Sequence, residues 1–106
     1  MTRGEIYEVR LPSRGRGGHE QRGRRYAVIV QVDELLELST VIVAPTSTRA
    51  RVATFRPGIE IGGEPTRVLV EQLRVLDVGR LGRLAGRLSG AEQDRVDEAL
   101  ALVLGL

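Results

Sequence analysis

The side chains with the most useful chemistry stand at the borders of two apolar segments. Arg25 is followed by Tyr26 and then by the apolar run AVIV, and the hydroxyl residues Thr46, Ser47 and Thr48 come directly after the run VIVAP. An arginine held by a buried strand presents a planar fork of donors to a phosphate, and a hydroxyl adds one directed hydrogen bond. Preorganised donors of this kind can stabilise the charge that develops on phosphoryl oxygens during cleavage.

Cleavage of RNA requires few catalytic groups from a protein, because the ribose 2′-hydroxyl of the substrate is itself the nucleophile. The 106-residue chain has no cysteine, no lysine and a single histidine, His19. Those counts exclude thiol catalysis, disulfides and cysteine metal sites, and they argue strongly against a histidine metal cluster. We therefore expect a reaction that uses no metal and no cofactor, with His19 as a candidate acid or base near neutral pH.

Each candidate also has an ordinary structural interpretation, which the sequence leaves open. Arg25 could pair with Glu20 or Glu71 on the surface. The hydroxyls at 46–48 could bond to nearby backbone, as turn residues commonly do. His19 lies in a glycine-flanked loop, where it could simply be solvated.

The charge distribution favours a polyanionic partner. Residues 1–25 hold seven arginines and three acids, a net charge of +4, whereas residues 26–64 carry −2 and residues 65–106 are balanced. Much of the excess lies in a loop of glycine and arginine at about residues 13–24. Loops of that length are usually functional or disordered, and a local basic patch favours nucleic acid.

The apolar patterning predicts a mainly β protein with one terminal helix. Ser89 and Glu92 form a capping-box pattern, Val96 and Leu100 follow at helical spacing, and Gly105 ends the segment. Many short strands with glycine and proline corners indicate a small, bent antiparallel barrel, with the helix covering one opening. We expect strands over 4–11, 25–32, 40–44, 52–55, 59–61, 66–75 and 80–88, a helical turn over 33–37, and the helix over 90–104.

No apolar run approaches the 18 or so residues that a membrane-spanning helix needs, and the N-terminus lacks the apolar segment of a signal peptide. The expected location is therefore the cytoplasm, with no membrane partner.

Five segments, in order along nearly the whole chain, together resemble the MazF/PemK family of bacterial toxin ribonucleases. They are RGEIY at 3–7, GHEQ at 18–21 followed by Arg25, VIVAP at 41–45 followed by hydroxyls, VEQLRVLD at 70–77, and the segment from 80 to 89 that leads into VDEAL at 96–100.

The resemblance implies one PemK/MazF-like toxin domain over residues 1–106 and an SH3-like barrel of the type shared by CcdB and PemK. It implies the toxin of a type II toxin–antitoxin system, a homodimer that cleaves single-stranded RNA in a sequence-specific manner. The RNA would be messenger RNA, with ribosomal and transfer RNA as further candidates. The products would be a 2′,3′-cyclic phosphate and a 5′-hydroxyl, and a cognate antitoxin's C-terminal segment would block the RNA groove in the dimer.

The resemblance also assigns residues. It implies that Arg25 is catalytic and that Ser47 stands where the family has a catalytic threonine, while Tyr26 replaces the family's usual proline. Thr46 and Thr48 remain alternative sources of the hydroxyl, and the loop at about 13–24 would gate the site. The further RNA-binding residues that we expect are His19, Glu20, Gln21, Arg24, Thr46, Thr48, Glu71 and Gln72.

Two other functions remain open at this stage. A gyrase poison of the CcdB type would use the same barrel to bind a protein, which is an argument from fold alone. A non-catalytic barrel would bind RNA tightly through the arginine-rich loop, in a salt-dependent manner and without products.

Overall fold

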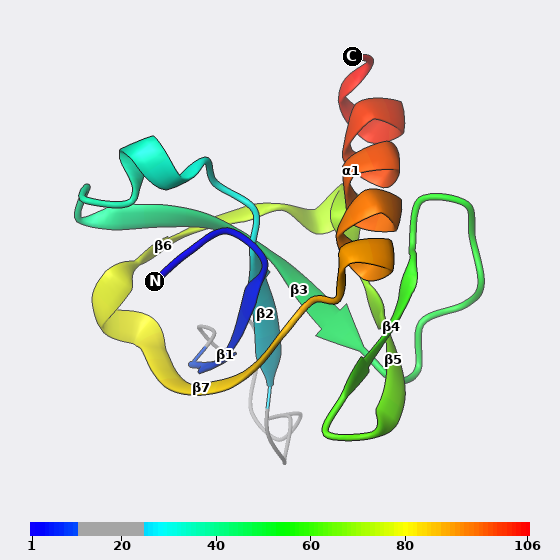
Figure 1. Cartoon of the computed structure of the whole chain (residues 1–106), viewed down its shortest axis with the longest axis horizontal. Coiled ribbons are helices and arrows are strands. Elements are labelled where there is room, and N and C mark those ends of the chain that lie inside the picture. The colour runs from blue at the N-terminus through cyan, green and yellow to red at the C-terminus, as the bar shows by residue number, and fades with distance from the viewer. Residues whose placement is uncertain (11–24) are drawn as a thin grey trace, which may run out of the picture.

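A strongly curled antiparallel sheet with one C-terminal helix makes up the fold (Figure 1). The computed structural model describes residues 1–10 and 25–106. In that part of the chain the sheet order is β4-β5-β3-β2-β1-β7, and β6 pairs with β3 beside β5. The sheet curls into a half-barrel, which confirms the predicted mainly β class. The elements are β1 (Glu5–Val9), β2 (Tyr26–Ile29), β3 (Thr40–Ser47), β4 (Gly58–Ile61), β5 (Glu64–Val68), β6 (Arg74–Asp77), β7 (Leu81–Arg87) and α1 (Gly90–Leu104), with short 3-10 turns η1 (Asp33–Leu35), η2 (Val70–Gln72) and η3 (Val78–Arg80).

The central strand β2 is buried on both faces, as its continuous apolar run predicts. Val28 points into the cluster beneath α1, which includes Val96 and Leu100. Ala27 and Ile29 point into a second cluster, on the opposite face of the sheet. Successive side chains of a strand alternate between faces, so a strand covered on both sides must be apolar throughout. This packing makes β2 a rigid support for the residue at its start.

Strand β3 is longer than the sequence predicts, because it continues through Pro45 to Ser47. Its first half pairs with β6 and its end pairs with β5, while β2 lies along its other edge. Pro45 sits in the interval between β6 and β5, where its carbonyl oxygen accepts a hydrogen bond from Leu69 N–H at 2.8 Å. The expected corner after residue 44 is therefore a continuous strand that carries the hydroxyl residues.

Two other strand predictions are wrong. The expected strand over 66–75 is divided into β5 and β6 by η2, because the two halves pair with different parts of β3. The segment 52–55 forms no strand, and the side chain of Val52 is 78% exposed, so it has no apolar surface on which to pack. The predicted strands at 4–11, 25–32 and 80–88 are present with shorter bounds, the strand at 59–61 is present as β4 and begins one residue earlier, and the predicted turn at 33–37 is η1.

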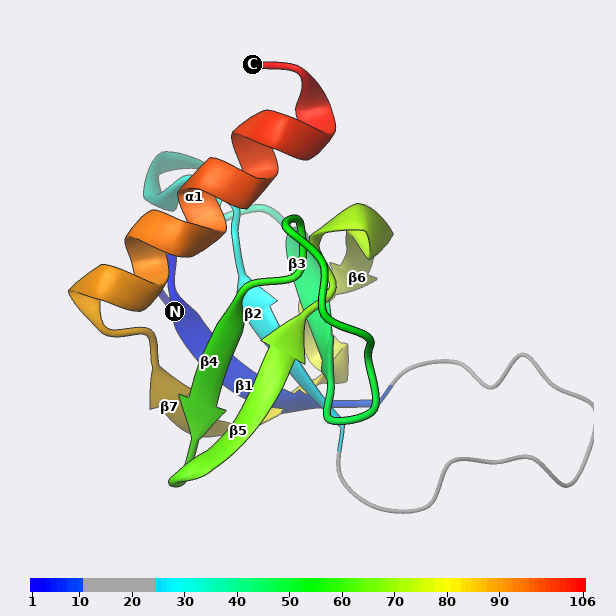
Figure 2. The same cartoon turned by 90° about the vertical axis from the view of Figure 1, so that its right-hand side faces the viewer.

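Helix α1 begins and ends where the sequence predicts. The Ser89 hydroxyl accepts from Glu92 N–H, the Glu92 carboxylate accepts from Ser89 N–H, and Gly105 ends the helix with a left-handed φ of 73°. Figure 2 shows α1 beside the β4–β5 hairpin. In the described ranges no helix has the length and apolar character that crossing a membrane requires.

Candidate functional site

The pairing of β2 with β3 brings the predicted catalytic residues together. Ala27 is paired with Pro45, and continuing this antiparallel register by two residues places Arg25 opposite Ser47. The contact between the Thr46 hydroxyl and the Tyr26 carbonyl agrees with that extension, because it joins the residues that the same register would pair next. On its other side, the Arg25 carbonyl accepts Val9 N–H of β1 at 2.9 Å. Side chains of directly opposed residues lie on the same face of a sheet. A guanidinium and a hydroxyl thus share one cross-strand row.

The three neighbouring hydroxyls differ in how their protons are used. The buried Thr46 hydroxyl donates to the Tyr26 carbonyl at 3.2 Å, so its proton is committed to the fold. The half-buried Ser47 hydroxyl accepts from Arg49 N–H at 3.1 Å, which occupies a lone pair and leaves its proton for a ligand. Thr48 is exposed beyond the end of β3. The geometry therefore favours Ser47, although its bond to Arg49 is also the local turn contact that the sequence allowed.

Glu71 is paired with Arg56, not with Arg25. Arg56 Nε and Nη2 donate to one Glu71 carboxylate oxygen at 2.9 and 2.6 Å. Burial alone would raise the pKa of Glu71, but the hydrogen bonds and charge of Arg56 outweigh burial and lower that pKa. Glu71 is therefore an ionised and already compensated carboxylate. Gln72 next to it is exposed, and its amide reaches the same carboxylate at 3.4 Å.

A second polar cluster ties β1 to β7. The carboxylate of Glu5, which is only 6% exposed, accepts hydrogen bonds from Thr2 N–H, the Tyr7 hydroxyl and Arg87. Burial raises the pKa of Glu5, but these donors and the positive charges of the N-terminus and Arg87 outweigh it, so the pKa lies below its ordinary value. The same burial and the bond to Glu5 raise the pKa of Tyr7. This cluster fixes β1, which pairs with the edge of β2 opposite to β3.

The structure adds a residue that the sequence argument missed. Arg67 on β5 is the direct cross-strand partner of Ser47, on the opposite side from Arg25. Its position between Thr66 and Val68, both buried, marks it as outward-facing in an alternating strand. The alternation of Arg67 with two apolar-facing neighbours is visible in the sequence, but only the β3–β5 pairing shows that Arg67 lies opposite Ser47.

Four predicted RNA-binding residues fall outside the described part of the chain: His19, Glu20, Gln21 and Arg24. The predicted gating loop at about 13–24 lies there too. Within residues 1–10 and 25–106, no three side chains of the types His, Cys, Asp or Glu gather as they would around a metal ion.

The fold and the order of its segments correspond to a known class of protein. Residues 2–104 match the family described as PemK-like, MazF-like toxin of type II toxin–antitoxin system. The chain therefore belongs to the PemK/MazF toxin family, as the five ordered segments predicted.

Relatives over the full length support this assignment. A candidate toxin of Mycobacterium tuberculosis, Rv3098A, is 42% identical over 107 residues, covering 100% of this chain and 99% of the relative. The endoribonuclease MazF9 of the same organism is 35% identical over 121 residues, covering 100% and 98%. Among solved structures, a mycobacterial endoribonuclease in complex with its cognate antitoxin superposes with a TM-score of 0.82 at 21% identity, covering 100% of this chain and 96% of that one.

Proposed function

We propose that this chain is a toxin that cleaves single-stranded RNA at particular sequences, without a metal ion. The observation that carries the proposal is the placement of Arg25 opposite Ser47 at the end of two buried strands, in a chain of this toxin family. The 35% identity to the endoribonuclease MazF9 supports the same reaction class. Messenger RNA is the proposed substrate, which places the action in the cytoplasm.

The reaction that suits these groups is attack by the ribose 2′-hydroxyl on the adjacent phosphorus. The bond from O2′ to phosphorus forms while the bond from phosphorus to O5′ breaks, one proton leaves the 2′-hydroxyl, and one is delivered to the leaving 5′-oxygen. The products are a 2′,3′-cyclic phosphate and a 5′-hydroxyl. Arg25 offers its planar donors to the phosphoryl oxygens, and Ser47 adds a directed hydrogen bond to the same group.

Cleavage of a long single-stranded RNA in EDTA tests this function directly. We expect the wild type to cut at a limited set of sites, and Arg25→Ala to lower kcat by at least about 100-fold, as loss of a preorganised donor does. Arg83→Gln, which removes an exposed arginine from β7, should cleave like the wild type. Tight RNA binding without products would contradict the enzyme in favour of a non-catalytic barrel. Trapped gyrase–DNA breaks with intact RNA would instead indicate a gyrase poison.

A homodimer and a cognate antitoxin complete the proposed system. Support for a dimer comes from large apolar side chains that are exposed on β3, β6 and α1. Ile42 and Val75 are cross-strand partners on β3 and β6, and they are 38% and 65% exposed. Leu102 and Leu104, near the end of α1, are also more than half exposed. Sedimentation should show a dimer that Val75→Asp dissociates, because burying an unpaired charge is costly. A wild type that remains monomeric at all concentrations would exclude the dimer.

The antitoxin is the partner that membership of a type II toxin family calls for. We propose that its C-terminal segment occupies the RNA groove of the dimer, so that it competes with substrate. The test is inhibition of cleavage by the antitoxin encoded beside this gene, together with competition against a bound RNA oligonucleotide. An antitoxin that binds without displacing the RNA would contradict this mode of inhibition.

A further inference from the structure

The structure assigns Arg67 as a second phosphate ligand, part of a subsite for the nucleotide next to the scissile phosphate. This inference rests on the proposed ribonuclease function and extends it. Its first support is position. Ser47 pairs with Arg67 on one side, and the β2–β3 register places Arg25 on the other, so the proposed catalytic hydroxyl lies between two arginines in one cross-strand row. The opposed Cα atoms of such pairs lie only about 5 Å apart.

The second support is charge. Arg56 and Arg67 are neighbours, yet they differ in what surrounds them. The guanidinium of Arg56 is neutralised by the Glu71 carboxylate at 2.6 Å. Arg67 Nη1 instead donates to the Arg56 carbonyl oxygen at 2.8 Å, a neutral partner that orients the guanidinium and leaves its charge uncompensated by that contact. An oriented, partly buried guanidinium with further donors is well suited to a phosphate.

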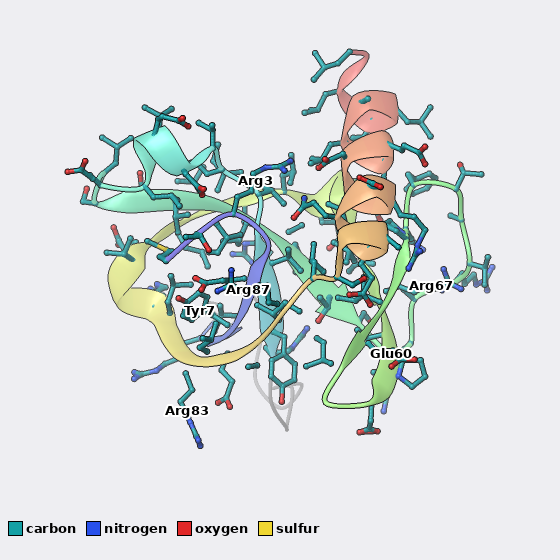
Figure 3. The ribbon with its side chains drawn as sticks, in the orientation of Figure 1. Arg3, Tyr7, Glu60, Arg67, Arg83 and Arg87 are labelled. Atoms are coloured by element: carbon teal, nitrogen blue, oxygen red, sulfur yellow. The ribbon has the colours of Figure 1, made fainter. Side chains whose placement is uncertain are left out.

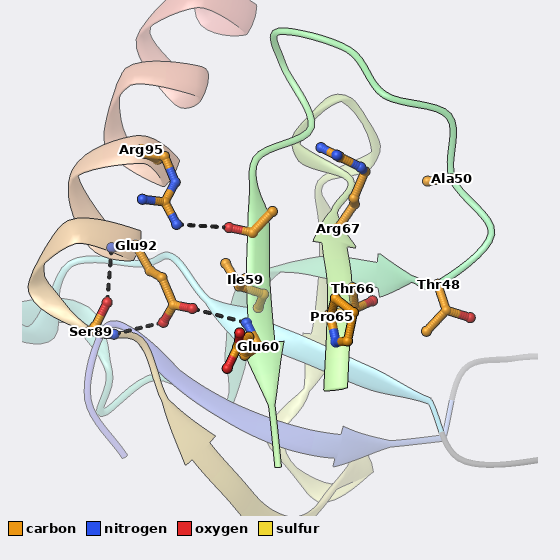
Figure 4. A pocket seen from close by; sticks show the side chains of 11 residues that line it. Thr48, Ala50, Ile59, Glu60, Pro65, Thr66, Arg67, Ser89, Glu92 and Arg95 are labelled. Carbon is orange, nitrogen blue, oxygen red and sulfur yellow. Dashed lines mark hydrogen bonds between the residues drawn. The ribbon is translucent and has the colours of Figure 1, made fainter. Parts of the chain in front are cut away.

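The third support is space for a nucleoside. A cavity of about 500 Å³ begins at Thr48, the residue after Ser47, and extends along the β4–β5 hairpin to the first turn of α1. Figure 4 shows Arg67 and Thr48 at one side of this hollow, and Arg95 and Glu92 at the other. Ile59 and Pro65 give it apolar wall. The size is within the range of small-molecule sites, which combine apolar walls with a few polar groups.

The lining of the hollow holds two acids, Glu60 and Glu92, whose charges are balanced by those of Arg67 and Arg95. One Glu92 oxygen accepts Ser89 N–H at 2.8 Å, and the other accepts Glu60 N–H at 2.9 Å. Arg95 lines the hollow beside Glu92 and donates to the Gly58 carbonyl. The phosphate-binding role therefore falls to Arg67, the cross-strand partner of Ser47. We place the base of the flanking nucleotide in this hollow and its phosphate on Arg67.

The experiment compares the wild type with Arg67→Gln, Arg67→Lys and the matched control Arg83→Gln. Figure 3 shows Arg83 projecting from β7, far from Arg67. The substrates are a short RNA containing one mapped cleavage site, the same RNA with single abasic nucleotides beside that site, and a form with 2′-deoxyribose at the cleaved position for binding. The conservative lysine variant separates loss of charge from local misfolding, and melting temperatures are measured for all proteins.

We expect Arg67→Gln to raise KM about tenfold with little change in kcat, and to lower the slope of log K against log salt by about 0.7, the effect of one single-strand phosphate contact. Arg67→Lys should retain most of the affinity. One abasic neighbour should weaken binding to the wild type, and the control should match the wild type throughout.

Unchanged KM and salt slope for Arg67→Gln on an RNA that the wild type cleaves would overturn the inference while leaving the ribonuclease intact. If abasic substitution changes binding equally on the two sides of the cleavage site, the assignment of a base to the hollow is wrong. A wild type that cleaves no RNA would instead refute the proposed function itself.

Discussion

The hydroxyl at the end of β3 gives the sharpest prediction, because three candidates stand in succession and only their hydrogen bonds separate them. Ser47→Ala removes a donor whose proton is left free by the bond from Arg49 N–H. Loss of one such donor costs about 2.7 to 4 kcal/mol of transition-state stabilisation. Since Ser47 is only half-buried, water can replace part of the interaction, and we expect the lower value. That corresponds to a decrease of about 100-fold in kcat.

The neighbouring substitutions should behave differently. Thr46→Val keeps the shape of the buried side chain but loses its bond to the Tyr26 carbonyl, so it should cost about 1 kcal/mol of stability. Its kcat, measured where the protein is fully folded, should stay close to that of the wild type. Ser47→Thr should retain activity, because threonine supplies the same hydroxyl with a stiffer rotamer. Thr48→Ala should also remain active.

The assay is single-turnover cleavage of a fluorescent RNA at saturating enzyme in EDTA, with thermal unfolding of each variant in parallel. Single-turnover conditions report the chemical step without product release. If Ser47→Ala cleaves as fast as the wild type, the hydroxyl assignment is wrong. If Thr48→Ala loses as much activity as was expected of Ser47→Ala, the catalytic hydroxyl is that of Thr48, one residue further along the chain.

Two predictions concern stability. Glu5→Gln should destabilise the fold at neutral pH; the folded-state pKa of Glu5 is lowered, so its contribution is present above the ordinary value of about 4.3 and is lost as the pH falls through the folded value. The difference in unfolding free energy from the wild type should therefore shrink in acid, and a constant difference from pH 7 to pH 3 would contradict the role of the charge. Ser89→Ala should cost about 1 kcal/mol as a lost helix cap, or about 4 to 5 °C in Tm for a chain of this size. Glu92→Ala should cost more, because it also removes the acceptor for Glu60 N–H on the outer edge of β4; equal Tm values for the two variants would show that this edge contact contributes nothing.

Local patterns in the sequence were enough for the elements that depend on neighbouring residues. The bounds of α1 follow from the cap at Ser89, the helical spacing of Val96 and Leu100, and the stop at Gly105, and all are interactions within a few residues. The buried character of β2 follows from a run too apolar to face water. The choice of Arg25 and the hydroxyl corner likewise rested on their borders with apolar runs and on the family resemblance.

Which side chains meet depends on strand pairing, which the sequence does not show. The continuation of β3 to Ser47, the division of the expected strand at 66–75 into β5 and β6, and the absence of a strand at 52–55 all depend on pairing between residues far apart in the chain. A strand's register with its partner is set by packing on both faces, and a shift of one residue would turn each side chain to the other face. The sequence alone therefore indicated an arginine and a hydroxyl of the right chemistry. The register of β2, β3 and β5 placed that hydroxyl between Arg25 and Arg67.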